Sequence, residues 1–343
     1  MTLHRGLIVA PSWIGDAILA QPLFQRLLER HPGLELDALA PRWVAPVLTR
    51  MPEIRQVIDN PFAHGELALQ ARWRLGRQLV AAGYDAVWVL PNSLKSALIP
   101  WFAGIPLRVG FLGESRYGLL NRWHRLDKNA TPLMVERFAL LAEAPGTPLP
   151  RPLPDPSLVS TPEQQAATLA ALDLPRPARL AAFCPGAEYG PAKRWPAKHF
   201  ATLARRLADQ GWTVWLFGSP KDAPVGDEIV AQSGGAARNL CGITSLDQAI
   251  DLLALADQVV CNDSGLMHVA AALGRPLTAL YGSSSPGFTP PLSSRAKVLR
   301  LGLECSPCFN RECPLSGDDH LRCLRDLQPE AVLAAMDEET KAP

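Results

Sequence analysis

The sequence predicts an α/β protein made of two Rossmann-like, doubly wound domains that face a central cleft. Short apolar strands alternate with amphipathic helices in the N-terminal half, a proline-rich stretch follows, and the same alternation then resumes. Alternation of this kind is typical of parallel βαβ units. The chain has 343 residues, which exceeds the ~250–300 residues at which a single hydrophobic core stops growing. Two domains are therefore expected.

The N-terminal half contains four predicted strand and helix pairs. Taken as strand and then helix, they are 7–10 with 17–30, 36–39 with 44–50, 57–58 with 66–82, and 86–90 with 93–102. This order predicts a parallel-sheet domain over residues 1–150.

Residues 144–162 differ in composition, because seven of these nineteen positions are proline and apolar periodicity is weak. Proline-rich stretches of this kind form stiff spacers. We expect an interdomain linker here, able to act as a hinge.

A second domain is predicted over residues 163–328. Its expected strands are 180–183, 213–217, 258–261 and 277–281, and its expected helices are 197–210, 225–231, 246–255 and 266–273. Residues 329–343 contain a final predicted helix, 330–339, able to pack on either domain.

Charge and hydropathy narrow the class of protein. The formal net charge of +1 gives no support to nucleic-acid binding. No signal-peptide pattern precedes the first strand, and charged residues interrupt every apolar run before the ~18 residues that a membrane span needs. We expect a soluble, cytoplasmic protein, with contact to a membrane surface left open.

The seven cysteines are expected to be reduced thiols in that compartment. Four of them, Cys305, Cys308, Cys313 and Cys323, follow the spacing C-x2-C-x4-C-x9-C across a loop. Four thiolates can close a tetrahedral structural zinc site, although this spacing is irregular for a zinc ribbon. A structural zinc and four ordinary thiols both remain open.

The most informative segment follows the strand that ends at Cys261. Asn262, Asp263, Ser264 and Gly265 lie between that strand and a helix over 266–273. Backbone N–H groups at a helix N-terminus attract phosphate, and glycine permits close approach of a ligand. The turn is therefore a candidate phosphate site, and an ordinary helix cap at Asp263 or Ser264 is the alternative.

A second loop, residues 184–196, also follows an apolar strand and precedes a helix. It contains Lys193 and Arg194 just before the expected helix start. A lysine at the mouth of a parallel sheet can pair with a diphosphate, whereas a solvated surface cation is the commoner role of a lysine.

The first strand is followed by Gly15 and Asp16. This turn has neither the G-x-G-x-x-G nor the Walker pattern, so dinucleotide binding by the first domain is not expected. A carboxylate at this position can deprotonate an acceptor hydroxyl, or it can serve as the N-cap of the helix over 17–30.

Cations are concentrated between residues 95 and 137. Lys95, Arg116 and Lys128 are among seven basic residues in this stretch, against three acidic ones, and aromatic residues lie between them. From charge alone, these three are candidates for contacts with an anionic, partly lipidic acceptor. Basic helix faces with aromatic residues in the core are the alternative reading.

Motifs in both halves resemble the heptosyltransferase II branch of glycosyltransferase family 9. They are Pro-Ser-Trp-Ile-Gly-Asp at 11–16, Leu-Pro-Asn-Ser-Leu-Lys-Ser-Ala-Leu at 90–98, Arg-Tyr-Gly-Leu-Leu-Asn at 116–121, Pro-Gly-Ala-Glu-Tyr-Gly-Pro-Ala-Lys-Arg-Trp-Pro at 185–196 and Asn-Asp-Ser-Gly-Leu-Met-His-Val-Ala-Ala-Ala-Leu at 262–273. The resemblance covers most of the chain and implies a GT-B fold. It implies inverting, metal-independent transfer of L-glycero-D-manno-heptose from ADP-heptose to the first heptose of the lipid A–linked inner core, with no cofactor, at the cytoplasmic face of the inner membrane.

The resemblance also assigns roles to particular residues. Asp16 matches the catalytic base, which favours that role over a helix cap. Lys193 matches the lysine that pairs with the donor diphosphate. Residues of the donor-binding turn are matched by Asp263, Ser264, Gly265 and His268, the last of which would donate to a phosphate or orient the turn. Asp222, after the strand at 213–217, lies where a carboxylate holds ribose hydroxyls in such folds.

Other readings of the same sequence remain open. Heptosyltransferase I or another core transferase would share the fold and the base and would differ in its acceptor. A nucleotide-sugar epimerase of the same fold would need no acceptor, and a non-catalytic nucleotide-sugar-binding protein would have no turnover to lose when Asp16 is replaced.

Overall fold

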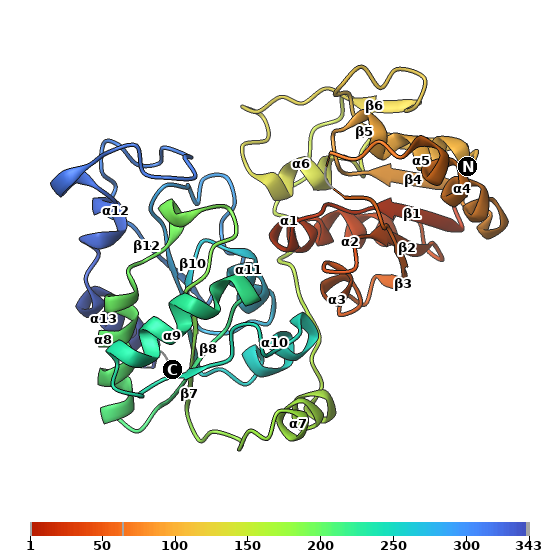
Figure 1. The fold of residues 1–343 in the computed structure, drawn as a ribbon. Helices are drawn as coiled ribbons and strands as arrows, with labels where there is room; N and C mark the ends of the chain where they lie inside the picture. The colour runs from red at the N-terminus through yellow and green to blue at the C-terminus, as the bar shows by residue number, and fades with distance from the viewer. Residues whose placement is uncertain (1, 64, 341–343) are drawn as a thin grey trace. The chain divides into compact units, whose positions relative to one another are not determined.

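Each half of the molecule is built on one six-stranded parallel sheet (Figure 1). The computed structural model describes residues 2–63 and 65–340, and the chain divides into two units, Met1–Pro156 and Ser157–Pro343. The predicted α/β fold class, with two doubly wound parallel sheets, is confirmed.

The first sheet has the strand order β3-β2-β1-β4-β5-β6. Its strands are β1 (Arg5–Val9), β2 (Glu35–Ala40), β3 (Ile54–Asp59), β4 (Ala86–Val89), β5 (Leu107–Phe111) and β6 (Arg122–His124). Its helices are α1 (Ile14–Leu19), α2 (Gln21–Arg30), α3 (Ala45–Leu48), α4 (Leu69–Leu79), α5 (Leu98–Phe102) and α6 (Met134–Leu140), with 3-10 turns η1 (Val80–Ala82) and η2 (Leu94–Ala97).

Helices cover both faces of this sheet, which explains why the central strand β4 is apolar throughout. Val87 and Val89 of β4 belong to the core cluster that also contains Leu79 and Ile99, from α4 and α5. Trp88 lies between them and so points to the opposite face, where its Nε1 donates to the carbonyl of Leu141, just after α6.

The second sheet has the strand order β12-β11-β10-β7-β8-β9. Its strands are β7 (Leu180–Cys184), β8 (Thr213–Leu216), β9 (Arg238–Asn239), β10 (Gln258–Asn262), β11 (Leu277–Leu280) and β12 (Ala296–Leu299). The helices are α7 (Pro162–Ala171), α8 (Ala197–Asp209), α9 (Ala223–Gln232), α10 (Leu246–Leu253), α11 (Gly265–Ala272), α12 (Arg322–Arg325) and α13 (Pro329–Thr340), with 3-10 turns η3 (Pro191–Lys193), η4 (Pro220–Asp222) and η5 (Gly317–Asp319).

The core of the second unit is centred on Trp195 and Phe200, whose rings meet edge to face at 4.8 Å. The indole Nε1 of Trp195 donates to the carbonyl of Leu327 at 2.7 Å. Val332 and Met336 of α13 lie in the same cluster, so the C-terminal helix packs on this unit.

The boundary between the units falls later than the start of the proline-rich stretch, and the linker is shorter than expected. Thr161 caps α7 through a capping box with Gln164, within the stretch assigned to the linker. The backbone N–H of Leu158 donates to Ala272, and the Ser160 hydroxyl donates to Asp251. Residues from Ser157 onward are therefore part of the second unit.

Among the described residues, seven helices and strands lie outside the sequence prediction. They are β5, β6, α6, α7, β9, β12 and α12. The strands β6 and β9 have three and two residues, which is too short to show a period. In the described residues, no helix is both long enough and apolar enough to cross a membrane.

Candidate active site

The predicted site residues follow strand ends at the carboxyl edges of the two sheets, and Asp16, Lys193 and Asp263 lie beside the strand pair at which each strand order reverses. Within its own unit, each sheet has the order 3-2-1-4-5-6, so the reversal falls between β1 and β4 and between β7 and β10. Ligands of open α/β sheets bind in the crevice at this topological switch point. Asp16 follows β1, whereas Lys193 follows β7 and Asp263 follows β10.

The structure brings Lys193 and Asp263 together. Because β7 and β10 are parallel neighbours, with Cys184 opposite Cys261, the loops that follow them leave the sheet side by side. The Nζ of Lys193 lies 2.5 Å from Oδ2 of Asp263. It also lies 5.0 Å from the centre of the Tyr189 ring, so the ammonium is held between a carboxylate and an aromatic face.

Asn262, at the end of β10, makes hydrogen bonds to the loop that carries Lys193. Its side chain is fully buried, its Oδ1 accepts from the backbone N–H of Trp195 at 3.0 Å, and its Nδ2 donates to the carbonyl of Pro185 at 2.7 Å. One amide thus satisfies backbone groups at both ends of the loop that carries Lys193. Sequence reasoning gave Asn262 no separate role, although its position at the end of a buried strand was a usable signal.

Ser264 is the N-cap of α11, and Gly265 is the first residue of the helix. The Ser264 side chain makes no cap hydrogen bond in the described residues, and its Oγ lies 3.3 Å from the sulfur of Cys261. The first backbone N–H groups of α11 therefore sit at a helix end that carries partial positive charge, next to the Lys193 ammonium.

His268 lies one turn into α11 and is buried. Burial lowers the pKa of His268 to about 4, while the nearby Asp263 carboxylate raises it and the Lys193 ammonium lowers it. The imidazole is therefore neutral at physiological pH, with one nitrogen that donates and one that accepts.

Both carboxylate oxygens of Asp222 have partners within the second unit, in addition to the contact with ribose that the sequence predicts. Its Oδ2 accepts from the backbone N–H and the hydroxyl of Ser219, and its Oδ1 lies 3.5 Å from Arg194. A Cβ added at Gly186 would lie 2.3 Å from the Asp222 carboxyl carbon, so the loop after β7 passes directly over it. This carboxylate fixes the shape of that loop.

Asp16 lies in the first turn of α1, which starts at Ile14 rather than at residue 17. The N-cap is Trp13, so the alternative reading of Asp16 as the cap is wrong. Asp16 is half-buried, and negative charge in a first helical turn is favourable.

The three predicted acceptor residues follow β4, β5 and β6, which all lie on one side of β1 in the sheet. Lys95 comes after β4, Arg116 after β5 and Lys128 after β6, so all three lie on the carboxyl side of the sheet with Asp16. Lys95 is half-buried and Lys128 is exposed.

Arg116 differs from the expectation. Its side chain is fully buried, and its guanidinium donates to the carbonyls of Pro91 and Phe111, to Ser96 Oγ and to Asn92 Oδ1. Burial lowers the pKa of Arg116 to about 10. These contacts make Arg116 a brace between the loops after β4 and β5, and no longer a candidate for direct contact with an acceptor.

The four C-terminal-region cysteines surround one small cavity of about 100 Å³, in a segment with little regular structure. Among the described residues, however, no group of three or more His, Cys, Asp or Glu side chains is arranged to hold a metal ion. The structure therefore gives no support to the zinc expectation for Cys305, Cys308, Cys313 and Cys323.

The cysteine-bearing segment instead packs on the loop that carries Lys193. The Tyr189 hydroxyl donates to the carbonyl of Phe309 at 2.7 Å, and the backbone N–H of Ala192 donates to the carbonyl of Arg311 at 3.0 Å. A Cβ at Gly190 would lie 2.4 Å from that Arg311 oxygen. The segment thus forms one wall of the Lys193 loop.

Some buried polar atoms near this loop have no hydrogen-bond partner among the described residues. They include the Oγ atoms of Ser283 and Ser284, which follow β11, and Nε of Arg194. Buried polar groups are normally paired, so these are groups that a ligand at the carboxyl edge can satisfy. The sequence analysis did not single out the two serines, because nothing in their pattern distinguishes them from loop residues.

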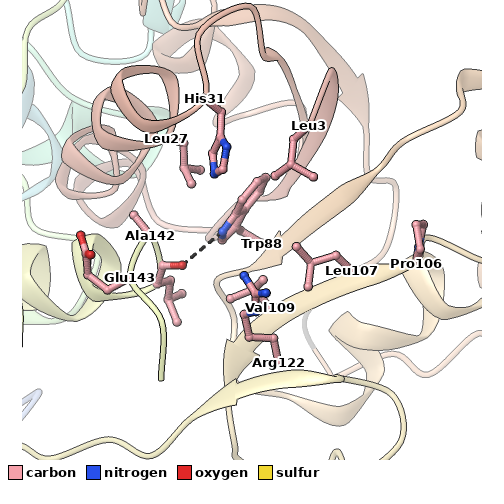
Figure 2. A pocket seen from close by; sticks show the side chains of 11 residues that line it. Leu3, Leu27, His31, Trp88, Pro106, Leu107, Val109, Arg122, Ala142 and Glu143 are labelled. Carbon is pink, nitrogen blue, oxygen red and sulfur yellow. Dashed lines mark hydrogen bonds between the residues drawn. The ribbon is translucent and has the colours of Figure 1, made fainter. Parts of the chain in front are cut away.

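A larger cavity, of about 450 Å³, lies elsewhere in the first unit (Figure 2). Leu3, Leu107 and Arg122 line it, and these residues precede or begin strands. The cavity is therefore at the amino edge of the sheet, opposite Asp16. Its carboxylate, Glu143, is already paired with Arg26 and Arg30.

Comparison with known proteins identifies this chain as a glycosyltransferase. A family model described as glycosyltransferase family 9 (heptosyltransferase) matches residues 72–317, and the chain belongs to this family. It is 50% identical over 304 residues to lipopolysaccharide heptosyltransferase 2 of Escherichia coli strain K12, covering 86% of this chain and 87% of the relative. Lipooligosaccharide heptosyltransferase 2 of Haemophilus influenzae is 47% identical over 345 residues, covering 97% and 98%.

A solved structure agrees with these relatives. The structure of E. coli ADP-heptose lps heptosyltransferase II matches with a TM-score of 0.87 and 45% identity, and the match covers 98% of each chain. The enzyme is thus a heptosyltransferase with the GT-B fold, as the motifs indicated.

Proposed function

We propose that this enzyme transfers heptose from ADP-heptose to the first heptose of the lipid A–linked inner core, with inversion at the anomeric carbon. The identity of donor and acceptor depends on one observation, the 50% identity over 304 residues to lipopolysaccharide heptosyltransferase 2. The geometry supports it, because a basic loop and a helix N-terminus meet beside Lys193 at one switch point and a carboxylate lies at the other.

In the proposed reaction, Asp16 is the general base. Its carboxylate takes the proton of the acceptor hydroxyl while that oxygen forms a bond to the anomeric carbon of the donor. The bond from the anomeric carbon to the diphosphate breaks, and ADP leaves with the electron pair. No covalent intermediate with the protein is needed.

The second unit would hold the donor and stabilise the charge that develops on ADP. Lys193 supplies one positive charge, and the N–H groups at Ser264 and Gly265 supply oriented dipoles. Asp263 positions the lysine, and neutral His268 can donate one hydrogen bond to a phosphate oxygen. Asp222 acts by shaping the loop beneath the donor. We keep ribose contact as a secondary role for it.

The first unit would hold the acceptor. Lys95 and Lys128 lie on the carboxyl side of the sheet with Asp16 and are suited to the phosphates of an anionic core. Arg116 would act as a positioning residue through the loop at Asn92 and Ser93. We place the reaction at the cytoplasmic face of the inner membrane, with the enzyme in peripheral contact with the bilayer.

Mass spectrometry of a defined acceptor tests this function. Purified enzyme is incubated with ADP-heptose and a Kdo2-lipid A acceptor that carries one heptose, in separate reactions with excess chelator and with added Mg²⁺. The expected result is the gain of one heptose in both reactions.

Parallel acceptors distinguish the alternatives. Gain of heptose on the acceptor that lacks heptose, and not on the monoheptosylated one, would identify a heptosyltransferase I activity. Loss of ADP-heptose without a heptosylated product would indicate an epimerase or a hydrolase and contradict the proposal. Product formed only with Mg²⁺ would contradict the proposal that Lys193 and the helix N-terminus suffice for the leaving group.

A further inference from the structure

Helix α4 exposes an apolar stripe to solvent. Leu69, Trp73 and Val80 are 52%, 48% and 42% exposed. They are spaced by four and seven residues along α4 and the η1 turn that continues it, which places them on one side of the helix. The stripe borders the buried side of α4, and packing in the core of the first unit does not explain why these side chains remain half exposed.

The buried side of α4, which borders this stripe, explains the orientation of the helix. Arg72, Gly76 and Leu79 are its buried residues. A Cβ at Gly76 would lie 2.6 Å from Phe102 and 2.8 Å from the carbonyl of Ile99, so α4 packs directly on α5. This close contact fixes which side of α4 is buried.

The start of α4 is fixed as well. The Arg72 guanidinium donates to the carbonyls of Leu67 and Glu66 and lies 4.1 Å from the centre of the Phe62 ring. It thereby holds exposed Leu67 next to the stripe. Trp101, also exposed, lies on the helix α5 that packs against α4.

Cations accompany the apolar side chains. Arg74 and Arg77 are exposed on α4, and no acidic residue occurs between Leu69 and Val80. We call Leu67, Leu69, Trp73, Arg74, Arg77, Val80 and Trp101 the α4 surface. Tryptophan prefers the boundary between water and lipid, and arginine is attracted to anionic headgroups, so this composition suits a negatively charged bilayer.

We propose that the α4 surface docks the enzyme on an anionic lipid bilayer. The proposal names the surface that makes the membrane contact given under the proposed function, and it rests on that function. Such contact is useful because the acceptor is anchored in lipid. A second copy of the chain fits less well. The five apolar side chains of the α4 surface are each about half exposed and together offer on the order of 500 Å², taking ~150–250 Å² for a whole side chain, whereas stable interfaces need ~800 Å² from each partner.

Co-sedimentation with vesicles tests the proposal. The full-length enzyme is mixed, near 0.15 M salt, with vesicles of phosphatidylcholine containing one quarter phosphatidylglycerol, and with vesicles of phosphatidylcholine alone. The wild type is expected to bind the anionic vesicles more tightly. The double variant Arg74→Glu/Arg77→Glu is expected to lose roughly 25-fold or more of this binding, because each arginine near such a surface contributes about fivefold.

Matched controls separate the surface from general effects. Arg205→Glu/Arg238→Glu places the same charge change on exposed positions of the second unit and should leave vesicle binding unchanged. The pair Trp73→Ser/Trp101→Ser should weaken binding to both vesicle types, whereas Ile243→Ser, at an exposed aliphatic residue of the second unit, should not.

Each remaining outcome has a definite meaning. Equal binding of the wild type and Arg74→Glu/Arg77→Glu to anionic vesicles would overturn the proposal. If Trp73→Ser abolishes self-association in analytical ultracentrifugation while vesicle binding is unchanged, the surface is an interface between copies and the proposal is wrong. With a deacylated, water-soluble acceptor, Arg74→Glu/Arg77→Glu should keep wild-type turnover. No turnover by the wild type with any acceptor would instead count against the proposed function, and vesicle binding is measured independently of it.

Discussion

The Nζ of Lys193 lies 2.5 Å from Oδ2 of Asp263, which joins the loop after β7 to the turn after β10. Asp263 is almost fully buried and Lys193 is largely so. In the proposed complex, the donor diphosphate would share the lysine with this carboxylate. The ion pair therefore presets the position of the cation before any ligand arrives.

Replacing Lys193 by glutamine should weaken ADP binding about 10- to 100-fold, because a hydrogen bond to a charged group is worth roughly 1.5–3 kcal/mol. Titration calorimetry with ADP measures this change. Lys198→Gln, at an exposed position on α8, is the matched control and should bind ADP as the wild type does.

The same variant separates binding from stability. Lys193→Gln leaves Asp263 buried without its cation and should lower the free energy of unfolding by roughly 1–3 kcal/mol. The double variant Lys193→Gln/Asp263→Asn should recover much of that stability while ADP binding stays weak. Full recovery of ADP binding in the double variant would contradict a direct role of Lys193 with the diphosphate.

Asp16→Asn should lower kcat by ~10²–10⁴-fold, which is the usual contribution of a general base. Binding of ADP should be unchanged, because the residue belongs to the first unit. Turnover is followed by mass spectrometry, with Asp209→Asn, at an exposed residue of the second unit, as the control. If activity falls less than about tenfold while the melting temperature drops, the carboxylate only stabilises the first turn of α1.

Asn262→Ala should destabilise the second unit, because it removes the partners of two buried backbone groups, the N–H of Trp195 and the carbonyl of Pro185. Each orphaned group costs ~1–3 kcal/mol. Urea denaturation of the wild type and of Asn262→Ala and Asn262→Asp measures the loss. Asn262→Asp keeps an acceptor for Trp195 but buries a carboxylate against the carbonyl of Pro185, so it should be at least as destabilised as Asn262→Ala, and wild-type stability of either variant would contradict this account.

His268 should make stability depend on pH. Its folded pKa is about 4, below the ordinary value of 6.5, so the unfolded chain binds more protons between these two values. Stability contributed by neutral His268 is present above pH 6.5 and is lost as the pH falls toward 4, by about 1.4 kcal/mol for each pH unit. Below about pH 4 no further loss is expected from this residue.

The comparison of the wild type with His268→Gln isolates this contribution. The difference between the two unfolding free energies, measured from pH 7.5 to pH 4, should be constant above pH 6.5 and should shrink by about 1.4 kcal/mol for each pH unit between pH 6.5 and pH 4. Parallel curves across the whole range would show that His268 is not buried in its neutral form.

Much of the fold could be predicted from the sequence, because the central strands of both sheets are covered on both faces and read as continuous apolar runs. Ala86–Val89 and Leu180–Cys184 are examples in which every residue is apolar and buried. Strand β5 escaped prediction because Arg108 and Gly110 interrupt its apolar pattern. The long-range register that pairs it with β4 is invisible in a local pattern.

The candidate site was predicted to a similar extent and for a related reason. Short motifs marked the strand ends at Lys193 and Asp263, and the pairing of β7 with β10 brought them together. The environment of Arg116 could not be predicted from the local sequence pattern, because its hydrogen-bond acceptors come from residues about 20–25 positions earlier as well as from Phe111. Charge in the sequence indicated a cation and gave no information on its burial.

The shared strand order of the two sheets has a consequence for how this enzyme can be altered. On the proposed assignment, one contiguous stretch of the chain recognises the lipid-linked sugar and another recognises the sugar nucleotide. The two stretches are divided near Pro156. A hybrid gene that joins the second stretch to the first stretch of another family member would keep the donor and exchange the acceptor. The two stretches can be exchanged separately because each sheet takes all of its strands from one of them.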